Sequence, residues 1–175
     1  MTIHAAASLA FAAAVAATSP AFAEWQVDGG VAIVAPTVNN STMELFTVSC
    51  GDPYQVEVYS RGGPARPDAE GGGADGTDYF YQPGKVEARI DGVVFRLAAA
   101  GSDAAVVLFS EGKAADQHLA PLGAAFIAAL KGGTTLTLAF DATPDALDGS
   151  PFETVAQFPL AGARAALEEA LAACP

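Results

Sequence analysis

The sequence predicts a mainly β, α+β domain: an antiparallel β-sandwich or half-open barrel of about eight strands with two helices, one of them C-terminal. Three observations predict this class. Short segments that alternate apolar and polar residues recur throughout residues 24–175, separated by turn residues. One β-hairpin, Lys85–Leu97, can be given a register. Two further segments, Leu119–Leu130 and Leu160–Cys174, have apolar residues at helical spacing instead.

Residues 1–23 have the features of a secretory signal peptide. Ala5–Ala17 is predominantly apolar, and Ala21-Phe22-Ala23 provides a small-x-small cleavage site directly before Glu24. The run is too short to cross a bilayer. The alternative is a buried N-terminal helix, since no Lys or Arg precedes the run. We therefore expect a periplasmic or secreted protein with a single β-rich domain at 24–175 and no membrane span after signal removal.

The chain is acidic, with a formal net charge of −12. Such a surface repels the phosphate backbone of nucleic acids and the headgroups of anionic membranes. Both are therefore excluded as expected partners. Solubility alone is also a sufficient reason for the acidity.

Cys50 and Cys174 are the only cysteines. In an exported chain such a pair predicts one disulfide, which by the chain-entropy model stabilises the fold by at most about 5 kcal/mol. The alternative is a reactive thiol pair, but the sequence has no Cys-x-x-Cys motif and no basic residue beside either cysteine. We expect a structural bridge that holds the terminal helix against an early strand.

The first strands follow from alternation. Trp25–Val34 is expected to form a strand interrupted at Gly29-Gly30, and Tyr54–Tyr59 forms the third. Between them, Met43–Cys50 places Phe46, Val48 and Cys50 on one face, so that Cys50 is expected to face inward.

Arg61–Gly84 interrupts the periodicity with many glycines and prolines and predicts a long flexible loop. Within it, Gly71–Asp78 is similar to the glycine-aspartate nonapeptide that binds calcium in β-helices, but Ala74 occupies a glycine position and no second copy follows. The aromatic run Tyr79–Tyr81 is expected to re-enter the sheet.

Lys85–Leu97 contains the clearest local signal. Asp91-Gly92 is a preferred pair for a two-residue type I′ turn, because both positions require positive φ. This turn places three apolar pairs on one face and pairs Glu87 with Arg96 on the other. Turn chemistry and hydrophobic pattern thus predict the same register.

The second half alternates strands and helices. A core strand is expected at Ala104–Phe109, and two more at Thr135–Phe140 and Phe152–Phe158. The first helix has Leu119, Leu122, Phe126 and Leu130 on one face, Pro121 in its first turn and Gly132-Gly133 at its end. The second helix has a stripe of Leu160, Ala163, Leu167, Leu171 and Cys174.

No motif predicts catalysis, a cofactor or a metal centre. His118 is the only histidine after the signal segment, and nucleophile-elbow, phosphate-loop and zinc-protease signatures are absent from the sequence. We therefore expect a non-enzymatic accessory or interaction protein of the bacterial cell envelope, with a protein partner. Two alternatives remain. One is a periplasmic small-molecule or cation-binding module with Arg61–Gly84 as its lid, and the other is an envelope hydrolase with a carboxylate pair.

Two stretches, Ala128–Phe140 and Phe158–Leu167, resemble the C-terminal half of the invasion-associated locus B family. Trp25, Cys50, Ile90-Asp91-Gly92 and Cys174 are similar to periplasmic accessory proteins of type VI secretion loci. Both resemblances imply a periplasmic β-rich domain without known catalytic residues. Several cysteines expected for the invasion-associated group are missing, and the long glycine-rich loop is additional.

Overall fold

A computed structural model describes residues 24–51, 53–60, 79–102, 104–110, 122–140 and 154–174. Within these residues the chain forms one antiparallel sheet and two helices, which confirms the predicted fold class. The strands are β1 (Gln26–Asp28), β2 (Val31–Val34), β3 (Val38–Asn39), β4 (Met43–Cys50), β5 (Tyr54–Ser60), β6 (Tyr79–Ile90), β7 (Val93–Ser102), β8 (Ala105–Ser110), β9 (Thr135–Phe140) and β10 (Thr154–Pro159). The helices are α1 (Ala124–Gly132) and α2 (Ala163–Ala170).

The sheet curls until its two ends approach each other. Its strand order is β1-β2-β4-β5-β8-β7-β6-β9-β10-β3. Strands β2 and β3 belong to opposite ends of this order, yet only Ala35–Thr37 separates them along the chain. The residues on both sides of β3 are fixed to β10, because Thr37 N donates to Gln157 O at 2.8 Å and Asn40 N donates to Val155 O at 3.1 Å. The result is a half-open barrel, and we call the β3–β10 junction the seam.

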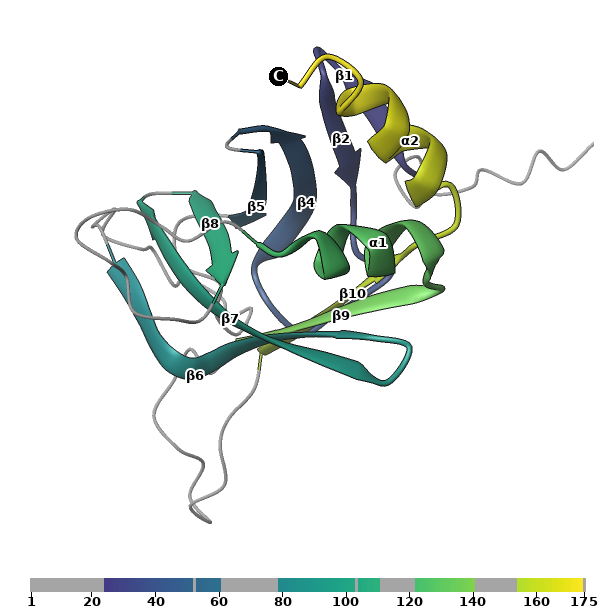
Figure 1. The fold of residues 1–175 in the computed structure, drawn as a ribbon. Coiled ribbons are helices and arrows are strands. Elements are labelled where there is room, and N and C mark those ends of the chain that lie inside the picture. Colours follow the sequence, from purple (N-terminus) through teal and green to yellow (C-terminus); the bar gives the residue numbers. More distant parts are fainter. Residues whose placement is uncertain are drawn as a thin grey trace, which may run out of the picture.

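Both helices cover the concave side of the sheet (Figure 1). Helix α2 lies beside β1 and β2, and α1 lies between α2 and the strands β9 and β10. The helices contribute Phe126, Ile127, Leu130 and Leu167 to the same core as the inward side chains of the strands. Aromatic contacts connect the layers, with ring centroids 5.3 Å apart for Phe95 and Phe126.

The predicted hairpin is confirmed residue by residue. Strands β6 and β7 pair in the expected register, and Asp91 and Gly92 have φ of 48° and 87°. Glu87 lies opposite Arg96 as predicted, but its carboxylate forms its ion pair with Arg89 on the same strand. The register was therefore predictable, whereas the choice of ion-pair partner was not.

Two predicted details of the first strands are corrected. Gly29 and Gly30 do not interrupt one strand; both have positive φ, 56° and 83°, and form the turn of the β1–β2 hairpin. Strand β3, at Val38–Asn39, was not predicted, because it pairs only with the distant β10. These two differences raise the number of described strands to ten.

Helix α1 begins later than predicted, at Ala124, although Leu122, Phe126 and Leu130 are buried as expected. It ends at the predicted glycines for a different physical reason. Gly133 has φ −85°, which any residue adopts, but a Cβ there would lie 2.5 Å from Ile90 Cγ2 and 2.8 Å from the Ala129 carbonyl oxygen. Position 133 therefore requires glycine because there is no space for a Cβ atom.

Several predictions fall wholly or partly outside the described residues. These include the signal peptide at 1–23, the segment 61–78 with its glycine-aspartate motif, and the residues His118, Leu119 and Pro121. Strand β6 begins at Tyr79, so the predicted loop to Gly84 is too long and the aromatic run enters the sheet as expected. No helix in the described ranges is long and apolar enough to cross a membrane.

Candidate interaction face and disulfide

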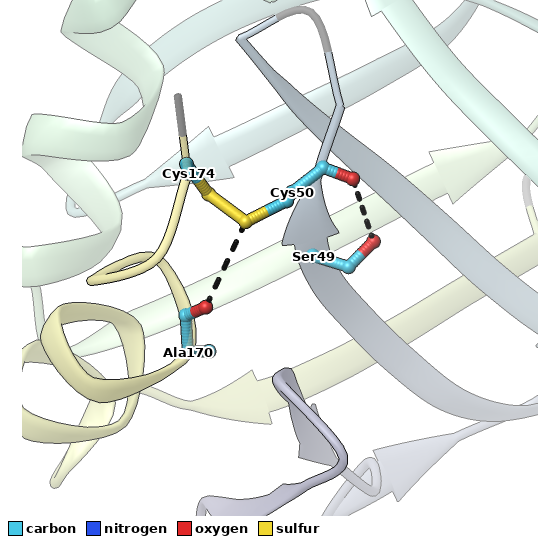
Figure 2. The surroundings of a disulfide bond; sticks show 4 residues. All are labelled: Ser49, Cys50, Ala170 and Cys174. Carbon is cyan, nitrogen blue, oxygen red and sulfur yellow. Dashed lines mark hydrogen bonds between the residues drawn. A yellow bond between two sulfur atoms is a disulfide. The ribbon is translucent and has the colours of Figure 1, made fainter.

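The structure brings together the two residues predicted as a disulfide. Cys50 at the end of β4 is bonded to Cys174, with the Cα atoms 5.3 Å apart and a sequence separation of 124 (Figure 2). Cys50 is on the same side of the sheet as Phe46 and Val48, as predicted. It is nevertheless solvent-exposed, because the strand ends there beyond the core.

The bridge lies against the last residue of α2. The Cys50 Sγ is 4.0 Å from the Ala170 carbonyl oxygen (Figure 2). A bridged sulfur has no proton to donate, so in the oxidised protein this is a packing contact. The disulfide therefore attaches the residues directly after α2 to the C-terminal end of strand β4.

The convex side of the sheet carries a largely uncharged surface over β2, β4, β5, β8 and β7. Strand register places one row of side chains across all five strands, and the order in this row is Ile33, Thr47, Glu57, Val107 and Ala100. Two parallel rows flank it, one with Leu45, Tyr59 and Ala105 and the other with Val31, Ser49 and Gln55. We call these three rows the convex face.

Glu57 is the single charged residue of the convex face, and it lies on the central strand. Gln55 Nε2 donates to Glu57 Oε1 at 2.7 Å, and the Tyr59 hydroxyl donates to Glu57 Oε2 at 3.3 Å. The charge of Glu57 raises the pKa of Tyr59, and partial burial and this hydrogen bond raise it further. Both of these hydrogen-bond donors are neutral side chains.

The composition of the convex face differs from that of the other half of the sheet. Across β7, β6 and β9, the outward residues include Arg96, Glu87 and Arg89, of which Glu87 and Arg89 form an ion pair. The convex face has no Lys or Arg, and its aliphatic residues Ile33, Leu45 and Val107 are half-buried. Tyr59 is 38% exposed. Charged and neutral outward surfaces are thus separated on one sheet.

The described residues contain no group of three or more His, Cys, Asp or Glu that could hold a metal ion. The segment 61–78, on which the cation-binding alternative depends, lies outside them, as does His118. The described residues therefore contain neither of the elements on which a cation site would depend.

The alternation within Tyr54–Tyr59 indicates that Gln55, Glu57 and Tyr59 share one face of a strand, but it does not indicate the surface to which they belong. Their neighbours come from β4 on one side and from β8 on the other. Strand β8 begins at Ala105, 45 residues after β5 ends at Ser60. Alternation within one strand shows which side chains share a face, but it does not show which other strand lies beside it.

Comparisons with protein-family models, with curated proteins and with solved structures give no match for this chain.

Proposed function

We propose that the protein is an exported, non-enzymatic accessory protein of the bacterial cell envelope that binds a protein partner through the convex face. The observation that carries this proposal is the registered row from Ile33 to Ala100, in which Glu57 is the single charge among neutral side chains. Outward positions on a solvated sheet face are usually polar or charged.

The chemistry of the convex face fits a protein interface better than a solvated surface. Interface centres are depleted in charged residues and enriched in aromatic ones, and a few such residues supply most of the binding energy. The convex face matches both features, because Tyr59 is an exposed aromatic residue and Glu57 is the only charged one. An acidic protein with one carboxylate in a neutral patch favours a partner with a basic residue at the matching position.

The proposed compartment rests on two features of the chain. The segment 1–23 has the pattern of a signal peptide, and disulfides persist in oxidising compartments such as the periplasm. The resemblances to exported scaffold proteins point to the same compartment.

Site-specific photo-cross-linking in the native bacterium tests this proposal. A benzoylphenylalanine is introduced at Tyr59, with Val94 as the matched control, because Val94 is also an exposed outward strand residue but lies outside the convex face. We expect one discrete adduct from position 59, in the fraction released by osmotic shock, and none from position 94.

A second pair of variants tests the role of the carboxylate. Glu57→Arg should reduce the adduct at least about tenfold, as expected for an interface centre, and Glu168→Arg on the exposed side of α2 should leave it unchanged. Equal adducts from positions 59 and 94, no adduct from position 59, or retention of the protein in the cytoplasm would each contradict the proposal.

A further inference from the structure

We infer that the disulfide is a redox-sensitive clasp: it keeps α2 docked on the sheet, and its reduction releases α2 as a unit while the sheet remains folded. This inference concerns a face of the molecule opposite to the proposed interface and does not depend on it.

Helix α2 makes few large contacts of its own. Its buried residues are Ala163, Ala166, Leu167 and Ala170, so that Leu167 is the only large apolar side chain it inserts into the core. Neither end has a side-chain cap, and the ion pair of Arg164 with Glu168 lies within the helix and attaches it to nothing else. An isolated helix of this length is not stable in water.

The segment that contains α2 is instead fixed at both ends. Before the helix, Leu160 is buried and the Trp25 indole Nε1 donates to the Pro159 carbonyl oxygen at 2.8 Å. After the helix, Cys174 is bonded to Cys50. With the bridge intact, an undocked α2 would therefore still be part of a closed loop between these two attachments.

The size of this loop sets the strength of the clasp. For a closed loop of about 15 residues, such as Leu160–Cys174, the chain-entropy model predicts that the cross-link disfavours the undocked state by about a hundredfold. Breaking the bridge removes this restriction and leaves the docked state dependent on Leu167, three alanines and the partly buried Leu171 that follows the helix. The strands that contribute most of the core are held by their own ladders, which the bridge does not supply.

The bridge is accessible to a dithiol reductant. One thiolate of the dithiol attacks Cys50 Sγ, which forms a mixed disulfide and releases Cys174 as the thiolate. The second thiolate of the dithiol then displaces Cys50, so that the reductant ends as a disulfide and two electrons and two protons reside on the cysteines. Attack at Cys50 is favoured because this residue is exposed and because the alternative would leave a Cys50 thiolate facing the Ala170 carbonyl oxygen.

Native-state hydrogen exchange tests the inference on the full mature chain in three forms: oxidised, reduced with dithiothreitol, and the Cys50→Ser/Cys174→Ser variant. We expect the amides of Ala166–Ala170 to lose about a hundredfold of protection in the reduced and the double-serine forms. Amides of β6, β7 and β9 should keep protection well above that of α2. Trp25 is the only tryptophan, so its accessibility to acrylamide gives a second readout that should increase in parallel.

Three results would overturn the inference. The first is unchanged protection of α2 after reduction. The second is an equal opening free energy for α2 and the central strands, which would mean that α2 opens only by global unfolding. The third is an unfolded double-serine variant, because the sheet would then depend on the bridge. In the oxidised form, Leu167→Ala should lower the protection of α2, and the central strands should remain better protected than α2, which tests the weak docking without any change of the cysteines.

Discussion

Gly133 shows how a single residue can be required for space. It follows α1 in an extended conformation, and the space that a side chain would need is already occupied by Ile90, Leu160 and the Ala129 carbonyl oxygen. Neither Ile90 nor Leu160 can move freely, because both are buried in the core. The neighbouring Gly132 has open space around the position of a Cβ.

These two glycines therefore predict opposite effects of the same substitution. Gly133→Ala should lower the free energy of unfolding by about 1–3 kcal/mol, because the added methyl group overpacks the site. Gly132→Ala should leave stability unchanged or raise it by up to about 1 kcal/mol, because alanine is the better residue inside a helix. Urea denaturation of both variants measures the difference, and a Gly133→Ala variant as stable as Gly132→Ala would contradict the packing argument.

Tyr54 makes the free energy of unfolding depend on pH in the alkaline range. Its hydroxyl donates to the Leu122 carbonyl oxygen at 2.5 Å, and burial raises its pKa above the usual value of 10.0. In the unfolded chain the phenol ionises near pH 10, whereas the folded protein keeps the proton to a higher pH. Unfolding thus releases a proton in this range, so stability is fully present below pH 10 and decreases as the pH rises through the folded pKa.

Tyr54→Phe should reduce this alkaline loss and, at pH 7, destabilise the protein by about 1 kcal/mol through the lost hydrogen bond. The measurement is the urea midpoint of the wild type and the variant between pH 7 and pH 11. The pKa of Tyr59 is also raised, by the charge of Glu57, so Tyr54→Phe should remove only part of the alkaline loss. A pH dependence that is identical in the wild type and Tyr54→Phe would contradict the assignment.

At the scale of elements, the β6–β7 hairpin is fixed to the next strand by its own turn residue. Asp91 Oδ2 accepts from Thr134 N at 2.8 Å and Oδ1 accepts from Thr135 N at 3.3 Å. The same residue adopts the positive φ that the turn requires. One side chain therefore sets the position of the hairpin tip relative to the start of β9.

Asp91→Ala should lower the free energy of unfolding by about 1–3 kcal/mol, because it leaves two backbone N–H groups without their acceptors. Asp91→Asn keeps a residue that favours the turn and one carbonyl oxygen, so it should cost less than the alanine variant. Thermal or urea unfolding of the two variants checks the order. Equal destabilisation of both variants would contradict this account, because the turn preference and the carbonyl oxygen that asparagine keeps would then contribute nothing.

At the scale of the whole molecule, local features were predictable and long-range neighbours were not. The hairpin register followed from Asp91-Gly92 because the turn and its strands are contiguous in the sequence. The pairing of Cys50 with Cys174 followed because no other cysteine is present. The adjacency of Glu57 to Val107, on which the convex face depends, has no local signal.

The early strands illustrate the same limit. Gly29-Gly30 was predicted to interrupt a strand, but it forms a hairpin turn. Val38–Asn39 forms a strand only because β10 lies beside it. Similarly, the Trp25 indole finds its acceptor at Pro159, which no periodicity in either segment indicates. Residue patterns determine which face of an element is apolar, but the order of elements in the sheet depends on packing over the whole chain.

The seam has a consequence for the time course of folding. Asn39 pairs with Ala156, and the disulfide joins Cys50 to Cys174, so both closures await residues near the opposite end of the chain. A polypeptide that crosses a membrane N-terminus first, as proposed here, presents β3 long before its partner arrives. Its early strands must then remain incompletely paired during translocation, a period in which aggregation or capture by a chaperone competes with completion of the barrel.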